Sequence, residues 1–439
     1  MARKESRAQE KRRLLAAAAS VRPPSDCDVI VVGGGAAGLV AAITAAEAGA
    51  LTVVLERDLE CGRRILATGN GRCNFANVSL DAQRYNDPAF VGSVCGQTWL
   101  GDVLSFFRTS GLRWRAEDGR LYPMSLQAAS VRNVLLSRAR RAGVVLAPAR
   151  EVVGMSLVDT RMPHAQITGG SGGMSVEVVC LEAFSDTRAF ALPNAKAVVI
   201  ASGGEGLPAA IDLGLHTAPR TPVLCPIACE DSPLRALDGR KADALVSLAK
   251  EGRTARGWRD RGTVLFRDYG ISGVVVFDLS RRAEPGDLVE LDLVPDLLEA
   301  ELIRIVDPAA SGSFASGVLD GVIDPVIAGV LERMAKERWQ LPDMEGTTPT
   351  TDAEALVSLV KRLPFRIMGP AEPQHAQVTR GGFKTDQFDP TTLASREHPW
   401  LFACGEALDV DADCGGFNLA WAWKSGMVAG SAAAWRALA

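Results

Sequence analysis

A strand, turn, helix and strand in succession near the start of the chain restrict its possible folds more than any other feature. The apolar run DVIVV begins at Asp28, GGGAAG follows it directly, and LVAAITAAEAG continues with helical spacing as far as Gly49. A second apolar run, LTVVLE, then ends on Glu56. Two apolar strands joined by a helix of this length are typical of a parallel sheet covered by helices. The sequence therefore predicts an α/β fold that begins with a βαβ unit.

Three glycines and one acid in this unit match a dinucleotide-binding fingerprint. Gly33, Gly35 and Gly38 have the required spacing, and Glu56 follows 18 residues after Gly38. In the fingerprint these glycines allow a tight turn, close approach of the backbone to a pyrophosphate, and close packing of helix on strand. The acid accepts a hydrogen bond from a ribose hydroxyl, and the helix N-terminus favours phosphate groups. We predict a bound nucleotide rather than a glycine-rich turn without a ligand, because strand, helix and acid all occur in order.

Composition and charge restrict the function classes. The 439 residues allow two or three domains, and 47% apolar with 23% charged residues is typical of a globular protein. The net charge of -4 excludes a global basic field, so we expect a small-molecule substrate and no nucleic-acid partner. No apolar run reaches the roughly 18 residues of a membrane span. The nine cysteines lack metal-ligand spacing, which predicts reduced cytoplasmic thiols and no metal site.

The chain divides into four parts by composition and periodicity. Residues 1–25 are basic and Ala-rich, which predicts a solvated or loosely helical extension. Residues 26–206 begin the nucleotide-binding domain and include three β-patterned runs, EVVGMSLVD, HAQITGG and MSVEVVCLEAF, expected to be antiparallel. Residues 207–370 form an expected inserted domain, with β-like runs that include TPVLCPIACE, GTVLFRDYG, GVVVFDLS and DLVELDL, and a helical part at about 296–362. Residues 371–439 return to the first domain.

Glycines also occur at the ends of two more expected strands. AKAVVIASGG contains Ser202 and Gly203 at its end, and LFACGE ends on Gly405 and Glu406. Glycine lets the backbone approach a ligand at the carboxyl end of a strand. The segment TGNGRCNFAN, residues 68–77, is rich in Gly and Asn and is therefore expected to be a loop. Strand ends with glycine and acid near both ends of the chain predict one long cofactor that spans them.

These blocks resemble those of the BaiN-like, or aminoacetone oxidase, family of NAD(P)/FAD-dependent oxidoreductases. The resemblance covers roughly residues 28–435 and rests on VVGGGAAGL, GRRILATGNGRCNFAN, VIASGG, GTVLFRDYGISG, VTRGG and CGEALDVDADCGGFNLAWAWKSG. It implies a two-dinucleotide-binding flavoprotein of the glutathione-reductase type. In that architecture, a Rossmann-like FAD-binding domain is interrupted by an inserted β-barrel with a helical bundle. We therefore expect FAD as the cofactor.

The resemblance assigns the flavin end of FAD to the 68–77 loop and to the helix that begins near Gly416. Asn70 and Asn74 are expected to meet the flavin carbonyls and ring nitrogens, and Arg72 either contacts the pyrophosphate or locks the loop to a carboxylate. The helix N-terminus stabilises negative charge on the reduced flavin. The full set of expected cofactor residues is Gly33, Gly35, Ala36, Ala37, Gly38, Glu56, Arg57, Gly62, Arg63, Arg64, Thr68, Gly69, Asn70, Gly71, Arg72, Cys73, Asn74, Val152, Ala201, Ser202, Gly203, Gly405, Glu406, Gly416, Phe417, Asn418 and Leu419.

The resemblance also implies the reaction. It is hydride transfer from NAD(P)H through FAD to an activated C=C or carbonyl group of a small organic substrate, for instance a steroid-like one. NAD(P)H is expected as a transient donor, because the chain has no second GxGxxG on a strand. A flavin-dependent amine oxidase that uses oxygen, and a non-catalytic flavin redox sensor, stay open. The insert departs most from the family pattern, so substrate choice is expected to differ there.

Few side chains in the family-like blocks can donate a proton or stabilise an enolate. The candidates are Tyr122, Tyr269, Arg380 and His375. Each has a simpler alternative, because a buried tyrosine hydroxyl often only satisfies its own hydrogen bond and an arginine often pairs with a carboxylate of the fold. Cys73 is expected to pack near the flavin rather than act as a redox thiol, because no CxxC motif contains it.

Overall fold

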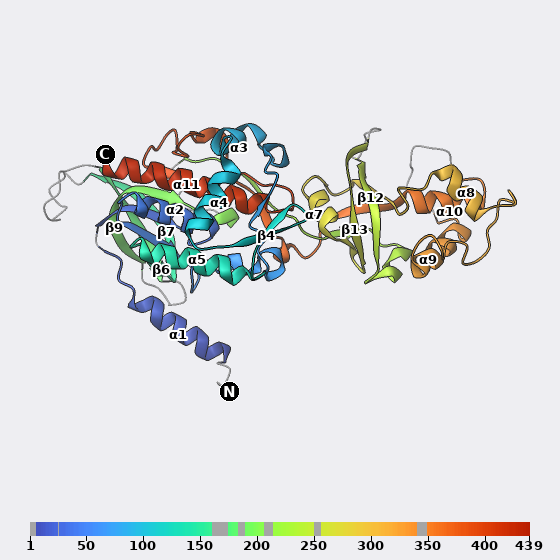
Figure 1. The fold of residues 1–439 in the computed structure, drawn as a ribbon, viewed down its shortest axis with the longest axis horizontal. Coiled ribbons are helices and arrows are strands. Elements are labelled where there is room, and N and C mark those ends of the chain that lie inside the picture. The colour runs from blue at the N-terminus through green and yellow to red at the C-terminus, as the bar shows by residue number, and fades with distance from the viewer. Residues whose placement is uncertain are drawn as a thin grey trace. The chain divides into compact units, whose positions relative to one another are not determined.

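The computed structural model describes residues 6–24, 26–159, 174–182, 189–205, 214–249, 256–339 and 349–439. The chain divides into two compact units (Figure 1). The first unit comprises Met1–Thr221 and Thr379–Ala439, and the second comprises Pro222–Val378. The chain crosses between the units within two strands that pair with each other, β10 (Thr217–Val223) and β17 (Val378–Phe383). Both crossings therefore lie within one two-stranded sheet.

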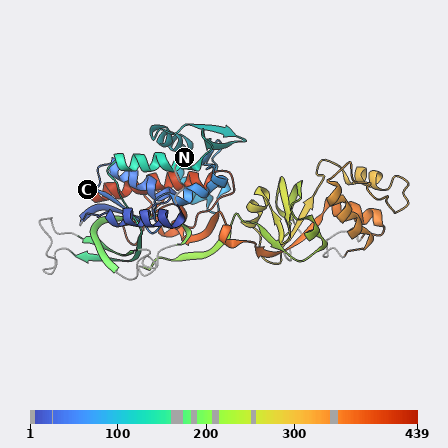
Figure 2. The same cartoon turned by 90° about the horizontal axis from the view of Figure 1, so that it is seen from below.

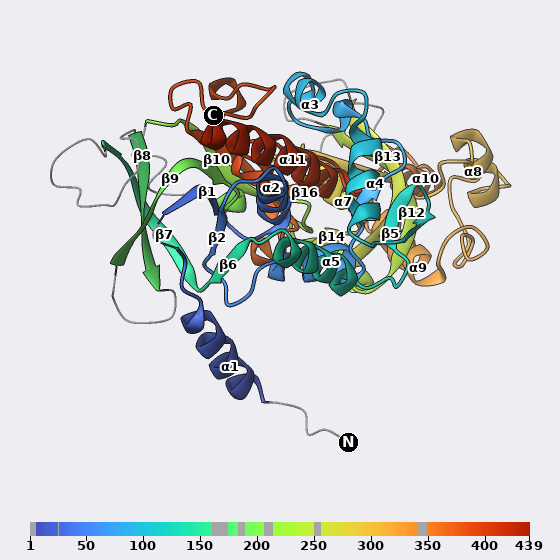
Figure 3. The same cartoon turned by 60° about the vertical axis from the view of Figure 1, so that its left-hand side comes forward.

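The first unit contains a seven-stranded sheet formed around the βαβ unit (Figure 3). Its strands are β1 (Asp26–Val32), β2 (Thr52–Glu56), β6 (Val145–Pro148), β7 (Arg150–Asp159), β8 (Met174–Glu182), β9 (Ala189–Ile200) and β18 (Leu401–Ala403). Their order is β6-β2-β1-β9-β8-β7, with β18 also paired to β9. The pairs on either side of β1 are parallel, as is β18 with β9, whereas β7, β8 and β9 are antiparallel. The expected strand HAQITGG lies outside the described residues.

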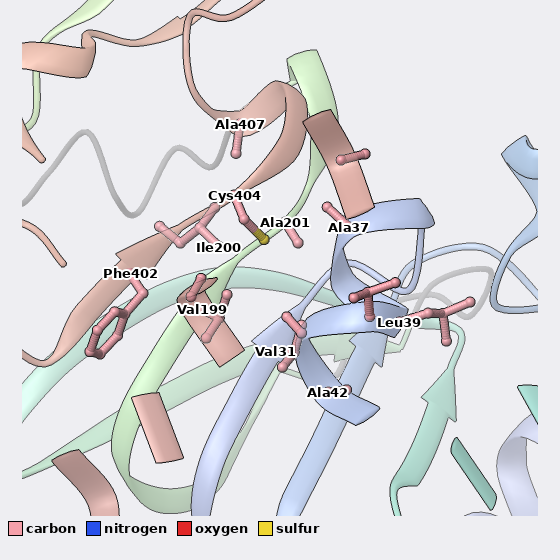
Figure 4. Packing of buried hydrophobic residues seen from close by; sticks show 14 of the residues in the cluster. Val31, Ala37, Leu39, Ala42, Val199, Ile200, Ala201, Phe402, Cys404 and Ala407 are labelled. Carbon is pink, nitrogen blue, oxygen red and sulfur yellow. The ribbon is translucent and has the colours of Figure 1, made fainter. Parts of the chain in front are cut away.

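The first unit also contains helices that pack on this sheet or on one another. They are α2 (Ala36–Glu47), α3 (Pro88–Cys95), α4 (Trp99–Thr109), α5 (Ala128–Arg141) and α11 (Phe417–Leu438). Both α2 and α11 contact β1, and they also pack on each other. Figure 4 shows part of the resulting core, with Val31 of β1, Leu39 of α2 and Val199 of β9 buried together. Each of these three side chains is fully buried, so the apolar runs of the sequence form the core.

Short elements complete the first unit. A three-stranded sheet has the order β3-β5-β4, from β3 (Ala76–Asn77), β5 (Arg120–Pro123) and β4 (Trp114–Glu117). The 3₁₀ turns among the described residues of both units are η1 (Arg63–Gly71), η2 (Ala82–Arg84), η3 (Gly203–Glu205), η4 (Pro233–Leu237), η5 (Pro373–His375), η6 (Thr385–Gln387) and η7 (Gly405–Ala407). Helix α1 (Arg7–Ser20) precedes the sheet and is largely exposed. None of the helices in the described ranges has the length and apolar character needed to cross a membrane.

The second unit is a closed barrel, with helices inserted in the sequence between its strands. The barrel order is β11-β14-β13-β12-β15-β16. Its strands are β11 (Ile227–Cys229), β12 (Lys241–Ala249), β13 (Arg256–Arg267), β14 (Gly270–Ser272), β15 (Leu288–Asp292) and β16 (Leu363–Pro370). Three helices, α8 (Glu299–Val306), α9 (Pro325–Lys336) and α10 (Asp352–Lys361), lie between β15 and β16 in sequence and beside one end of the barrel (Figure 2). The expected α/β fold with an inserted β-barrel and helical part is confirmed.

One expectation in the insert is wrong. The run GVVVFDLS forms a helix, α7 (Val274–Ser280), and not a strand. Gly273 begins it with a φ of 118°, a value that L side chains rarely adopt. The helix buries Val275, Val276 and Leu279, which share one helical face, and a Cβ on Gly262 of β13 would lie 2.9 Å from Cβ of Val275. Packing against the barrel thus overrides the preference of three adjacent valines for a strand.

Candidate cofactor-binding site

The three fingerprint glycines in the turn after β1 differ in the space around them. Gly33 has a φ of 104°, and a Cβ there would lie 2.4 Å from the carbonyl oxygen of Ala201. A Cβ on Gly38 would lie 1.9 Å from the carbonyl oxygen of Gly33. A Cβ on Gly35 would meet no heavy atom within 4 Å. The first and third glycines are therefore required by close packing, and the second opens a face toward a ligand, as in the fingerprint.

Glu56 lies at the end of β2 and closes this turn. Its carboxylate accepts hydrogen bonds from the backbone N–H groups of Gly34, at 2.6 Å, and Asp58, at 2.8 Å. Burial raises the pKa of Glu56, and the two N–H donors partly offset this effect. The neighbouring Arg57 is exposed, and Val152 is buried in β7. The fingerprint acid thus touches the backbone of the glycine turn.

The ends of β9 and β18 lie beside the glycine turn (Figure 4). Ala201 donates its N–H to Val32 of β1 at 2.8 Å. Ser202 follows with a buried Oγ that has no hydrogen-bond partner within the described part of the chain. Gly203 has a φ of 71°, and Gly405, which follows β18, has a φ of 63°. The carboxyl ends of β1, β9 and β18 therefore meet at one edge, where open α/β sheets bind ligands.

Glu406 is half-buried at this edge. Burial raises the pKa of its carboxyl group to about 7, although the positive charge of Arg64 and the N–H groups of Gly204 and Thr379 act in the opposite direction. Arg64 lies near Gly203, since a Cβ there would be 3.9 Å from the guanidinium. Arg63 instead is exposed, 3.9 Å from Asp58. Of these two neighbouring arginines, therefore, Arg64 lies next to the strand ends, whereas Arg63 lies near Asp58.

The 68–77 loop contains a run of left-handed backbone. Gly69, Asn70, Gly71 and Cys73 all have φ between 53° and 82°. Two of these four are not glycine, and such strained residues occur preferentially at functional sites. The N–H of Cys73 donates to the carbonyl of Thr68 at 2.9 Å, which closes the turn. The segment is therefore a loop, as expected, with a defined and strained conformation.

Asn74 carries a buried amide oxygen with no partner. Its Oδ1 is inaccessible and makes no hydrogen bond to any described residue. A Cβ on Gly416, at the start of α11, would lie 2.8 Å from this oxygen, so the loop and the helix are in close contact. An unpaired buried acceptor costs about 1–3 kcal/mol, so a ligand that donates a hydrogen bond fits here. A flavin ring N–H is such a donor. The buried Oγ of Ser202, just after β9, is a second polar atom without a hydrogen-bond partner among the described residues.

The start of α11 is held by side chains, not by a capping residue. Gly415 and Gly416 have positive φ values, and the amide of Asn418 both accepts from Ala412 N–H, at 2.8 Å, and donates to Ala412 carbonyl, at 2.9 Å. The side chain of Asn418 is thus used within the protein, and the hydroxyl of Tyr85 donates to the carbonyl of Phe417 at 2.6 Å. Leu419 is partly buried against the core. The start of α11 therefore presents backbone N–H groups, and not these side chains, to a ligand.

Arg72 locks the loop to a neighbouring strand. Its guanidinium pairs with Glu117 of β4 and lies 4.3 Å from the ring centroid of Tyr122 on β5. Arg115 also pairs with Glu117, at 2.9 Å. Of the two roles expected for Arg72, the structure therefore shows the ion pair with a carboxylate that holds the loop in place. Glu117 had no signal in the sequence, because its partner is 45 residues away in the chain.

The expected proton donors lie in both units. Arg380 forms two hydrogen bonds with the fully buried carboxylate of Asp411, at 2.9 and 3.0 Å. Tyr122 is buried under Arg72. Tyr269 belongs to the second unit, where burial raises the pKa of its hydroxyl and its carbonyl accepts from Cys229 N–H at 2.8 Å. The side chain of His375 lies outside the described part of the structure.

Cys73 is fully buried and is one of nine free cysteines. Burial raises the pKa of its thiol to about 12. The thiolate is the reactive form of cysteine, so this side chain is expected to be a poor nucleophile near neutral pH.

A separate open cavity of about 870 Å³ in the first unit contains none of the expected site residues. Residues of α4 and α11 line it, among them Phe106, Lys424, Met427 and the exposed Trp435. It therefore does not mark the cofactor site.

Comparison with known proteins gives the family. The model described as "HI0933-like protein Rossmann domain" matches residues 27–432. The chain is 31% identical over 416 residues to a 3-dehydro-bile acid delta(4,6)-reductase of Clostridium scindens, covering 91% of this chain and 97% of that protein. It is 25% identical over 392 residues to a ribosomal RNA dihydrouridine synthase of Escherichia coli, covering 88% and 93% respectively. The chain belongs to the HI0933-like Rossmann family, as its motifs indicate, and is an oxidoreductase with the FAD-binding fold of that family.

Proposed function

We propose that this protein uses FAD and NAD(P)H to reduce a carbon–carbon double bond conjugated to a carbonyl group. The two kinds of named relative act on different molecules, but their names describe related chemistry. Saturating the 4,6-unsaturation of a 3-oxo bile acid and converting uridine to dihydrouridine both remove a C=C next to a carbonyl. A hydride adds to the β-carbon and a proton to the α-carbon, while NAD(P)H is oxidised. The shared chemistry, rather than either substrate, is what we assign to this chain.

The single observation that carries the cofactor assignment is the unpaired, buried Oδ1 of Asn74 at the junction of the 68–77 loop and α11. When bound, FAD supplies the hydride-transfer chemistry. We assign the pyrophosphate to the open face at Gly35 and to Arg64, and the ribose to Glu56. Asn74 would accept a hydrogen bond from the flavin ring, and the positive end of α11 would stabilise negative charge on it.

Arg380 and a tyrosine are the proposed groups for the substrate. The buried carboxylate of Asp411 orients Arg380, whose side chain keeps one third of its surface exposed. A fixed, always charged guanidinium suits the oxygen that becomes negative when hydride adds. Tyr122 and Tyr269 are alternative proposed proton donors. Tyr122→Phe and Tyr269→Phe test them separately, because each removes only the hydroxyl.

We propose a small-molecule enone as the substrate, since the bile-acid reductase is the more similar of the two kinds of relative. A second candidate is uridine in RNA, favoured by similarity over 88% of this chain to the dihydrouridine synthase. Catalysis of amine oxidation by oxygen, or redox sensing without a substrate, are the remaining alternatives.

The first experiment is a visible spectrum of the purified protein, followed by anaerobic mixing with NADH and then NADPH. We expect oxidised-flavin bands that bleach within seconds with one of the two nucleotides. Addition of a 3-oxo-4-ene steroid acid, or of uridine-containing RNA, then shows which one restores the bands. A yellow protein that neither nucleotide bleaches contradicts the NAD(P)H proposal and favours an oxidase. A colourless protein that FAD does not reconstitute overturns the cofactor assignment.

A further inference from the structure

Two buried tryptophans at the start of α11 hold two separate segments of the proposed site. The indole N–H of Trp423 donates to the carbonyl of Phe75, in the 68–77 loop, at 2.8 Å. The indole N–H of Trp421 donates to the carbonyl of Gly405 at 3.1 Å, and Gly405 N–H donates to the hydroxyl of Ser425 at 2.9 Å. Both indoles are at most 1% exposed. One helix therefore holds the loop and the end of β18.

The position of α11 is itself fixed by contact with α2. Gly426 and Gly430 lie at this contact, where a Cβ would be 2.5 Å from Ala37 oxygen and 2.2 Å from Ala41 oxygen, respectively. No side chain fits between the helices at these two places. Because α2 starts at the glycine turn, the turn and the 68–77 loop are positioned by the same pair of helices.

The contact of Trp423 acts next to the unpaired amide. Phe75 is fully buried, its N–H donates to Leu121 at 2.9 Å, and its carbonyl accepts from Trp423. Asn74 precedes Phe75 in the chain. The hydrogen bonds of the Phe75 N–H and carbonyl fix the backbone there, which restricts the position of Oδ1 of Asn74. The indole ring packs edge-on against Phe107, with centroids 5.0 Å apart, so its N–H is oriented by the core.

We propose that Trp423 is a positioning residue for the flavin: its N–H sets the backbone at Phe75 and hence the position of the Asn74 amide. This inference rests on the proposed FAD site. Trp423 acts through the loop and not by contact with the cofactor.

Trp423→Phe tests the inference, because it keeps an aromatic ring and removes the N–H. We expect the dissociation constant for FAD to rise about tenfold, the effect of one lost hydrogen bond to a buried carbonyl. The absorption bands and midpoint potential of the bound flavin are expected to shift, because Asn74 moves. Trp435→Phe, on the same helix with its side chain 77% exposed, is the matched control and leaves all three unchanged.

The outcomes separate the inference from the proposed function. Lower stability of the FAD-free Trp423→Phe protein, with the affinity, spectrum and potential of the wild type, overturns the inference and leaves a purely structural role. A wild-type protein that binds no FAD overturns the proposed function instead. If Trp423→Phe does not fold, Asn77→Ala replaces it, because Asn77 Nδ2 donates to Gly415 carbonyl at 2.9 Å and is the second link between loop and helix. An unchanged flavin spectrum and affinity in Asn77→Ala then overturn the inference.

Discussion

The glycine turn after β1 and the 68–77 loop belong to the same proposed site but are stabilised in different ways. In the turn, the backbone packs on backbone, with no room for a Cβ at Gly33 or Gly38. In the loop, two non-glycine residues, Asn70 and Cys73, hold left-handed backbone. Contacts from distant elements keep the loop in place, including the indole of Trp423 and the carboxylate of Glu117.

This difference separates local from remote control of a binding site. A turn made of close backbone contacts is determined by a few adjacent residues, so its substitutions act mainly on folding. A strained loop held by remote side chains depends on the rest of the domain, so substitutions in those side chains act on ligand affinity. Substitutions in the turn, in the loop and in the supports of the loop test this distinction.

The largest expected effect is that of Gly38→Ala. Its Cβ would lie 1.9 Å from Gly33 oxygen, so the turn or the helix must move. We expect a loss of about 3 kcal/mol or more in the free energy of unfolding, together with loss of FAD binding. Chemical denaturation of the FAD-free protein measures the first, and flavin fluorescence measures the second.

Gly35→Ala is the matched control in the same turn. The added Cβ meets no heavy atom within 4 Å, and Gly35 has a φ of -77°, which alanine adopts easily. We expect unfolding free energy within about 1 kcal/mol of wild type, and FAD affinity lower by at least tenfold, because the methyl group occupies the face toward the pyrophosphate. Equal loss of stability in both variants contradicts the division of roles among the glycines.

Glu406 gives the next effect, and it depends on pH. Burial raises the pKa of its carboxyl group from an ordinary 4.5 to about 7. Between these values the unfolded chain releases the proton while the folded chain keeps it, so the free energy of unfolding falls as pH rises. We expect Glu406→Gln to stabilise the FAD-free protein by on the order of 2 kcal/mol at pH 8 and to leave it unchanged near pH 4. Urea unfolding at both pH values measures the difference.

The exposed Glu397 provides the control for this experiment. Glu397→Gln is expected to change stability equally little at both pH values. A Glu406→Gln protein whose stabilisation is the same at pH 4 and pH 8 shows that the carboxyl group does not titrate between them.

The βαβ unit could be predicted because its signals are local, whereas the β-barrel of the insert was implied only by the resemblance to the family. Alternation, helical spacing and the glycines after Val32 all lie within about thirty residues. The helical state of α7 could not be predicted. Three adjacent valines favour a strand in isolation, and only packing on β13 makes the segment a helix.

In the candidate site, the glycine turn and the two strand ends were recognisable from spacing, whereas the supports of the 68–77 loop were not. Trp423 and Phe75 are 348 residues apart, so no periodicity connects them. The only available signal was that a buried indole N–H needs a partner. Asp411 was likewise missed as the partner of Arg380, although it lies in a block that resembles the family.

Glu117→Gln is expected to have a smaller effect on the loop. It removes the charge that pairs with Arg72 and leaves the contact of Arg72 with the Tyr122 ring. Because the pair is partly exposed, we expect only about a threefold rise in the FAD dissociation constant, and less at high salt. Arg115→Gln removes a different partner of Glu117 and is the control. A larger effect of Arg115→Gln than of Glu117→Gln would show that Arg72 does not hold the loop.

The smallest expected effect on the bound flavin is that of Cys73→Ser. The thiol is fully buried, and burial raises its pKa to about 12, so it is protonated at neutral pH. Serine has nearly the same size and the same backbone preferences, which leaves the strained conformation unchanged. We expect FAD to stay bound, turnover to stay within severalfold of wild type, and stability to fall by about 1 kcal/mol for the buried hydroxyl. A loss of turnover or of flavin reoxidation by several hundredfold would instead make Cys73 a chemical participant, and the loop would then be more than a scaffold held from outside.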